Sequence, residues 1–312
     1  MSTAASLPAA VAAPTLGFEI PKEFLAAPSA AASALPVGSA KGSFVVDGKV
    51  VELRHAYATQ TIVPEKDAPG ATLSQRNVVE IVLSEKELSS AMVHSELRRA
   101  ASSMAGTFRG VSFYLHENAA RNPSLIIFYP IIPTGTWNVV PEGDEMRVEV
   151  GDFALRGDTI SGRLGMTAAE SARMKLSEDE ADSWQVMTTS FSSRLESPPQ
   201  PKELDKPATL KSPWFAALLA WSSMVSAKDF GRMGDVLTGM ALAEQRERLQ
   251  KKGPAAMGSG GSAQEAAEQL VSSSATSDEA TVVIKPYKDK PFTYSVQLLL
   301  MDGKWKLARF QM

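Results

Sequence analysis

The sequence predicts an α+β protein. It begins with an antiparallel β-sandwich or barrel-like domain that carries one inserted helix, and a smaller domain follows in which helices pack on a curved antiparallel sheet. Three observations lead to this fold class. Runs of β-branched and aromatic residues flank Asp47-Gly48, a strong signal for a two-residue hairpin turn. Short strands with Gly, Asp and Pro between them continue to residue 191. An apolar helix at 213–225 then precedes further strands.

The composition limits the function classes. The chain has 312 residues, of which 44% are hydrophobic and 21% charged, which is typical of globular proteins with about two domains. A net charge of -3 disfavours nucleic acid and anionic membranes as partners. The absence of cysteine excludes disulfides, a thiol nucleophile and thiolate zinc sites. No apolar run approaches the roughly 20 residues that span a bilayer, so the chain is predicted to be soluble.

Residues 1–41 are predicted to be a flexible leader. They are rich in Ala, Ser and Pro, and Lys22 is their only positive charge before Lys41. They lack the uninterrupted apolar core of a secretory signal peptide. Removal of an export signal upstream of this leader stays open as an alternative.

The β-rich domain is predicted over 42–196. After the Asp47-Gly48 turn, period-two alternation places four side chains on the core face of the second strand: Val51, Leu53, His55 and Tyr57. Ser84 and Glu87 have the spacing of a capping box, which predicts one helix within 85–104. The remaining strands are expected at 78–83, 111–115, 125–132, 136–140, 146–155, 159–165 and 184–191.

These segments resemble an uncharacterised β-rich module of bacterial exported proteins. The resemblance rests on 42–49 (G-x-F-x-V-D-G-K), 55–58 (H-A-Y-A), 160–164 (I-S-G-R-L) and the aromatic strand at 184–191. It implies a periplasmic or extracellular bacterial setting and no established activity. A cytoplasmic location stays open.

A proline-rich linker is predicted at 197–212, followed by the second domain at 213–312. Ser212 can cap a helix that begins at Pro213, the favoured first position. A second short helix is expected to begin at 228–230, and further helices are expected at 240–252 and 263–273, with a Gly/Ser loop at 253–262. Strands are expected at 280–285, 292–301 and 304–310, the last two joined by a hairpin turn at Asp302-Gly303. This order of helices and strands, closing on D-G-K-W-K-L, is similar to the NTF2-like α+β cone.

An apolar face in the second domain is the first candidate ligand site. Helical spacing aligns Trp214, Leu218 and Trp221, and strand parity aligns Tyr294 and Val296 with Phe292, Leu298 and Leu300. Such a face can line a pocket for a small apolar ligand or fill the core. The core interpretation is preferred because no ionisable residue interrupts the face.

His55 and Tyr57 are the second candidate, because an imidazole and a phenol two residues apart can share a pocket. The simpler interpretation is that both side chains are half-buried and form hydrogen bonds with the backbone. Arg156-Gly157-Asp158 is interpreted as a polar hairpin turn, and Gly258 to Gly261 as a linker. No histidine has metal-motif spacing, so no catalytic residue, metal or cofactor is predicted.

Three functional hypotheses follow. The first is a non-catalytic binding or structural protein of the bacterial envelope or extracellular space, with an unknown protein partner. The second is binding of a small apolar ligand in the C-terminal domain. The third is an enzyme with an unrecognised site near His55 and Tyr57.

Overall fold

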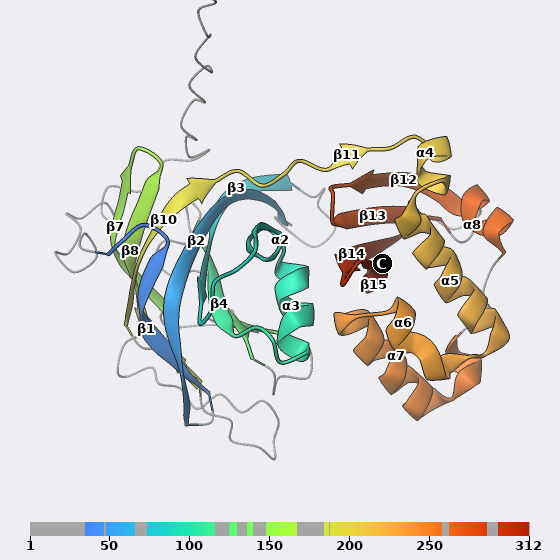
Figure 1. Cartoon of the computed structure of the whole chain (residues 1–312), viewed down its shortest axis with the longest axis horizontal. Coiled ribbons are helices and arrows are strands. Elements are labelled where there is room, and N and C mark those ends of the chain that lie inside the picture. Colours follow the sequence, from blue (N-terminus) through green and yellow to red (C-terminus); the bar gives the residue numbers. More distant parts are fainter. Residues whose placement is uncertain are drawn as a thin grey trace, which may run out of the picture. The chain divides into compact units, whose positions relative to one another are not determined.

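The protein is mixed α+β. The computed structural model describes residues 35–46, 48–65, 74–115, 125–129, 136–139, 148–166, 184–186, 188–257, 262–285 and 293–311. Within these residues, one curled antiparallel sheet forms a half-barrel, and a second antiparallel sheet is accompanied by several helices (Figure 1). The predicted α+β class is confirmed at this level.

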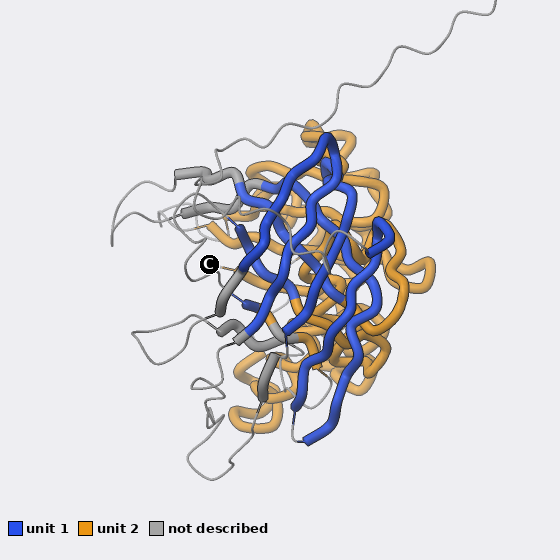
Figure 2. Tube along the Cα trace, turned by 90° about the vertical axis from the view of Figure 1, so that its left-hand side faces the viewer, with its two compact units in different colours: residues 1–83, 112–125, 140–198 blue, residues 84–111, 126–139, 199–312 orange. Residues whose placement is uncertain are grey.

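The chain divides into two compact units that are discontinuous in sequence (Figure 2). Unit 1 consists of Met1–Leu83, Ser112–Leu125 and Val140–Pro198, and unit 2 consists of Ser84–Val111, Ile126–Val139 and Pro199–Met312. The last boundary falls inside the predicted linker. The two earlier segments of unit 2, however, lie within the stretch that the sequence assigned to a single β-rich domain. The predicted leader lies almost wholly outside the described residues.

The first sheet has the strand order β6-β5-β4-β3-β2-β1-β10-β8-β7, with β9 paired to β1 and a further pairing between β2 and β10. Its strands are β1 (Ser39–Val46), β2 (Lys49–Glu65), β3 (Ser74–Ser84), β4 (Gly110–Leu115), β5 (Leu125–Phe128), β6 (Thr136–Val139), β7 (Val148–Arg156), β8 (Thr159–Met166), β9 (Trp184–Val186) and β10 (Thr189–Glu196). Most strands predicted for this part of the sequence are present with shifted ends, but the single strand predicted at 184–191 is divided into β9 and β10. Residues 130–132 of the strand predicted at 125–132 lie outside the described residues.

The predicted hairpin turns are confirmed. Val46 pairs with Lys49 across the first turn, where Gly48 has a φ of 71°. Arg156 pairs with Thr159 across a turn in which Gly157 has a φ of 62°, so Arg156-Gly157-Asp158 belongs to the β7–β8 hairpin. Glycine fits both positions because it lacks the Cβ that penalises positive φ.

The buried positions of β2 change parity after Leu53. Ala56 and Ala58 are buried, whereas His55 and Tyr57 are only half-buried. The change coincides with an irregular register between β1 and β2 and with the parallel pairing of β10 to Ala58 and Thr59. The predicted core face of β2 is therefore wrong beyond Leu53, because a register shift of one residue exchanges the two faces of a strand. The half-buried state of His55 and Tyr57 agrees with the simpler interpretation of these two side chains.

Unit 2 contains the second sheet, in the order β11-β12-β13-β14-β15. Its strands are β11 (Lys202–Glu203), β12 (Leu270–Ala275), β13 (Glu279–Ile284), β14 (Tyr294–Met301) and β15 (Lys304–Gln311). Its helices are α2 (Ser90–Val93), α3 (Glu96–Met104), α4 (Lys206–Leu210), α5 (Pro213–Ala227), η3 (Phe230–Arg232), α6 (Met233–Val236), α7 (Gly239–Lys252), η4 (Pro254–Met257) and α8 (Ala263–Gln269).

Two short helices replace the single helix predicted within 85–104. Ser89 caps α2, and Ser95 caps α3 by accepting a hydrogen bond from the backbone N–H of Arg98. Ser95 has an extended backbone, with φ -133° and ψ 104°, which ends the first helix before the second begins. The predicted cap, Ser84, instead donates its hydroxyl hydrogen to the carbonyl of Lys86.

The segment predicted as a linker is partly folded. Lys202 and Glu203 pair with β12, and α4 follows. Asp205 caps α4, and the hydroxyl groups of buried Thr209 and Ser273 share a hydrogen bond of 2.6 Å. The second half of the predicted linker therefore contains secondary structure, because capping and this tertiary hydrogen bond organise a polar stretch that has no apolar period of its own.

The predictions for the rest of unit 2 are confirmed in large part. Ser212 caps α5, Pro213 is its first residue, and Asp302-Gly303 forms the β14–β15 turn with φ values of 50° and 74°. The helix predicted at 263–273 ends at Gln269, and its last residues form β12. Pairing with β13 overrides the helical interpretation there, since Ser-rich sequence has little helix preference.

Both faces of the second sheet are covered within unit 2. On one face, buried residues of α5, α6 and α7 pack with those of the sheet: Trp214, Phe215, Leu218, Val225, Met233, Leu237, Ala241, Met257, Ala280, Val282, Val296, Leu298 and Leu307. On the other face, Leu299 and Ala308 pack against Ala101 of α3. Gly239 allows α7 to approach α3, because a Cβ at this position would lie 3.1 Å from the Cβ of Ala101.

Candidate functional site

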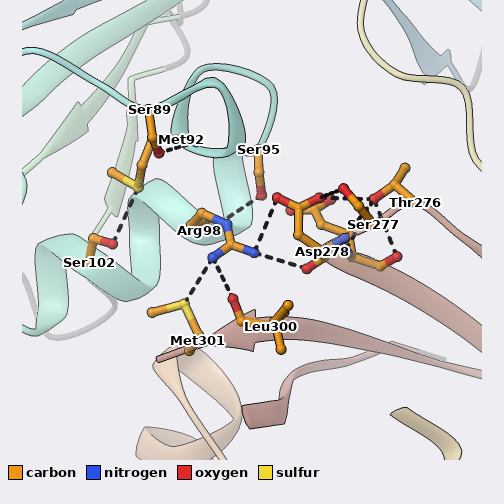
Figure 3. Close-up of polar contacts among 11 residues, drawn as sticks. Ser89, Met92, Ser95, Arg98, Ser102, Thr276, Ser277, Asp278, Leu300 and Met301 are labelled. Atoms are coloured by element: carbon orange, nitrogen blue, oxygen red, sulfur yellow. Dashed lines mark hydrogen bonds and ion pairs between the residues drawn. The ribbon is translucent and has the colours of Figure 1, made fainter. Parts of the chain in front are cut away.

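Helices α2 and α3, with the loops that flank them at 84–89 and 105–111, contribute polar side chains to two cavities in the described part of unit 2. We refer to residues 84–111 as the α2–α3 segment. Arg98 attaches this segment to the second sheet, as Figure 3 shows. Its Nη1 donates to the carbonyl of Leu300 at 2.7 Å and its Nη2 to the carbonyl of Asp278 at 2.9 Å. The Nη2 atom also lies 3.7 Å from the Asp278 carboxylate.

A cavity of about 290 Å³ lies beside this attachment. We call it the His94 cavity. It is lined by Ser90, Ala91, His94, Ser95, Pro199, Thr276, Ser277, Asp278 and Glu279. This set contains hydroxyl groups, an imidazole and two carboxyl groups, which are residue types that can perform acid-base chemistry.

Glu279 is the most perturbed acid of this cavity. Burial raises the pKa of its carboxyl group above the ordinary value, and the negative charge of Asp278 acts in the same direction. A hydrogen bond from Ser95 and the positive charges of Arg98 and Arg99 oppose this rise in pKa. The Oε1 atom of Glu279 is buried and accepts no hydrogen bond within the described residues.

The polar groups of the His94 cavity are largely engaged in holding the fold. The Ser95 hydroxyl accepts the α3 cap hydrogen bond and bonds to Glu279, so it is not placed as a free nucleophile. The Asp278 carboxylate accepts hydrogen bonds from Thr276 and Ser277, which hold the β12–β13 turn. Within the described residues, no three His, Asp or Glu side chains are grouped to hold a metal ion. The Ser95 and Asp278 side chains at this cavity are therefore explained by their part in holding the fold.

Glu279→Gln is expected to raise the melting temperature at neutral pH. Because the pKa of Glu279 is raised in the folded state, folding favours the protonated carboxyl group. The contribution of this group to the stability of the fold is therefore fully present at low pH. That contribution is lost as the pH rises through the folded-state pKa. A neutral Gln removes the loss, so the variant should show its largest advantage at about pH 8 and little at about pH 4.

Melting temperatures measured across this pH range test the expectation, with Glu244→Gln on the exposed face of α7 as the control. An advantage that is the same at every pH, or that also appears in the control, would show that burial of Glu279 does not govern the effect.

A second cavity, of about 300 Å³, is formed by the α2–α3 segment itself. We call it the Arg109 cavity. It is lined by Lys86, Glu87, Leu88, Ser89, Met92, Ser102, Thr107, Phe108 and Arg109. Cationic groups and apolar side chains therefore meet in one small space, which is the mixture that binding sites for small molecules usually present.

Two residues that line the Arg109 cavity have hydrogen-bond donors with weak acceptors or none within the described residues. The guanidinium group of Arg109 lies 5.7 Å from the ring centroid of Tyr129 and 3.8 Å from the Glu85 carboxylate, near the outer limit of an ion pair. Its Nε has no acceptor within the described residues. The hydroxyl of Ser102 donates to the thioether sulfur of Met92 at 3.4 Å, and sulfur is a weak acceptor.

The candidates predicted from sequence lie elsewhere. His55 and Tyr57 belong to β2 in unit 1, whereas the apolar candidates belong to unit 2. Trp214, Leu218 and Val296 belong to the buried cluster on the α5 face of the second sheet, which agrees with the preferred core interpretation. Trp221 is partly buried, with its ring 6.4 Å from that of Phe310, and Tyr294 is half-buried. Phe292 lies outside the described residues.

Sequence reasoning missed both cavities. Their lining residues follow no known motif, because the residues come from caps, loops and turns that only the fold brings together. One signal was available: Arg98 and Arg99 lie at adjacent positions in the segment predicted to contain a helix. An arginine that is buried in such a helix needs buried acceptors, and these would form a polar cluster.

Comparisons with known proteins do not indicate a function for this chain. No protein-family model matches the chain, and neither the curated proteins nor the solved structures gave a match. In the described part of the chain, none of the helices has the length and apolar character needed to cross a bilayer.

Proposed function

We propose that this protein is a non-catalytic binding protein that holds a small molecule in the Arg109 cavity. The observation that carries the proposal is a cavity of about 300 Å³ lined by Arg109 and Ser102, two residues with donors whose acceptors are absent or weak within the described residues. When a ligand supplies a better acceptor, such donors give up little hydrogen-bond energy within the protein. In the other cavity the hydroxyl of Ser95 and the carboxylate of Asp278 are engaged in holding the fold, which favours binding over catalysis.

The bacterial envelope or the extracellular space is the proposed setting. Support comes from the resemblance of the β-rich segments to a module of bacterial exported proteins. For the helices and sheet after residue 213, we propose the NTF2-like cone. The order of α5, α6, α7 and α8 followed by the antiparallel strands β12 to β15 supports it, as does the packing of α5 on one face of that sheet.

Filling the Arg109 cavity is expected to abolish ligand binding. Ser102 is 8% exposed and lines the cavity, so Ser102→Leu places a larger side chain in the space that a ligand would occupy. The test is a thermal-shift screen of the full chain with a mixed library of small anions, cations and neutral compounds. At least one compound should raise the melting temperature of the wild type and fail to do so in the variant.

The matched control is Ser226→Leu, at an exposed position near the end of α5 outside this cavity. The NMR spectrum of the bound compound should be unchanged after prolonged incubation, since no turnover is expected. If no compound gives a shift that depends on Ser102, the proposed site is wrong. If the compound is converted, the protein is an enzyme.

A further inference from the structure

We infer that the ligand of the Arg109 cavity is a small organic carboxylate with a short apolar chain. This inference rests on the proposed binding function and specifies its ligand class. It follows from the kinds of atoms that line the cavity, taken in turn: the charged groups, the weakly used donors and the apolar side chains.

Two of the three charged side chains that line the cavity are cationic. Lys86 and Arg109 contribute two positive charges to the lining, and Glu87 contributes one negative charge. Glu85 lies outside the lining and contacts Arg109 at 3.8 Å. The side chain of Arg109 is 41% exposed, so its guanidinium can be reached from solvent, and a guanidinium group pairs with carboxylates through parallel N–H groups.

The weakly used groups are donors. The Nε of Arg109 and the hydroxyl of Ser102 both carry hydrogens whose present acceptors are absent or weak within the described residues. A carboxylate has two acceptor oxygens and no hydrogen to donate, so it complements these groups. An ammonium group would place further donors against them, so a cationic ligand is disfavoured.

The apolar side chains distinguish an organic anion from an inorganic one. Leu88, Met92 and Phe108 line the same cavity, and Phe108 is 4% exposed with its ring 5.2 Å from that of Phe128. A short alkyl chain on these side chains removes apolar surface from water, at about 0.8 kcal/mol for each buried methylene group. Phosphate cannot gain this contribution. The flexible Met92 can adjust to chains of different length.

The experiment is isothermal titration calorimetry of the full chain with three probes. Hexanoate has a negative charge and an apolar chain. Inorganic phosphate has the negative charge without the chain, and hexylamine has the chain with a positive charge. Hexanoate should bind at least about tenfold more tightly than either of the others, because each lacks one of the two contributions. Equal or tighter binding of hexylamine or phosphate would overturn the ligand class.

Matched substitutions locate the binding. Arg109→Gln should weaken hexanoate binding by about tenfold or more, the scale of one hydrogen bond to a charged group. Lys86→Gln, at an exposed position, should weaken hexanoate binding by a smaller factor. If Arg109→Gln does not fold, the Lys86→Gln variant tests whether hexanoate binds in this cavity. Arg232→Gln, whose side chain is 71% exposed in η3, should leave hexanoate binding unchanged.

The outcomes separate the two proposals. If the cavity binds only amines or neutral compounds and Ser102→Leu abolishes that binding, the carboxylate inference is wrong and the binding function stands. If hexanoate binds equally to the wild type, Ser102→Leu and Arg109→Gln, it binds elsewhere and the carboxylate inference is wrong. The binding function is wrong as well only if no compound of the thermal-shift screen gives a shift that depends on Ser102.

Discussion

Phe215→Ala is expected to lower the free energy of unfolding by about 3–5 kcal/mol, the usual effect of removing a buried aromatic side chain. Phe215 is 2% exposed and lies in α5, within the buried cluster that joins this helix to the second sheet. The loss is large relative to the roughly 5–15 kcal/mol by which a domain is stable, so unit 2 should be partly unfolded at 37 °C. Denaturant unfolding of the full chain, followed by tryptophan fluorescence, measures the effect.

Phe230→Ala is the matched control, because Phe230 packs against the same cluster and is only partly buried. Its effect should be clearly smaller, and Trp221→Ala should also fall below the full cost of a buried aromatic, since Trp221 is partly exposed. If Phe215→Ala costs less than about 1 kcal/mol, as ordinary surface substitutions do, α5 does not form the core of this unit.

Arg99→Ala is expected to cost about 3 kcal/mol or more. The Arg99 side chain is fully buried, and its Nη1 donates to the carbonyls of Met92 at 2.9 Å and Val93 at 2.7 Å. These carbonyls lie at the end of α2, where the helix supplies no partner. Each buried carbonyl left without a donor costs about 1–3 kcal/mol. Loss of the cation–π contact with the ring of Phe128, at 5.5 Å, adds to the effect.

Two further variants separate the causes. Arg99→Met retains most of the side-chain volume without the donors, so it should recover only the part of the loss that comes from the cavity. Arg232→Ala removes an exposed arginine that pairs with Asp235, and its cost should stay within about 0.5 kcal/mol. Full recovery of stability in Arg99→Met would show that packing, and not hydrogen bonding, makes Arg99 important.

The candidate site could be predicted from the sequence only in fragments. The serines that cap α2 and α3 are recognisable residue types, yet the sequence pointed to Ser84 instead of Ser89 and Ser95. Choosing among neighbouring serines requires knowing where the backbone becomes extended, and that depends on packing. The Arg109 cavity needs α3 and both of its flanking loops in place at once, so no spacing rule identifies it.

Local features were determined by the sequence itself. The turns at Gly48, Gly157 and Asp302-Gly303, and the start of α5 at Ser212-Pro213, depend on the backbone preferences of a few adjacent residues. Those preferences act over distances of two to four residues, so a single sequence is enough to predict them. The α+β class follows from the same local periodicities.

Only the tertiary structure decided where these elements belong. Arg98 bonds to Leu300, 202 positions away in the sequence, and this contact joins α3 to the second sheet, although the chain places α3 among the strands of the first. The bulge that removes His55 and Tyr57 from the core depends on the register of a partner strand. Hydrogen bonds and packing between distant residues leave no local period, so their consequences can be seen only in the folded chain.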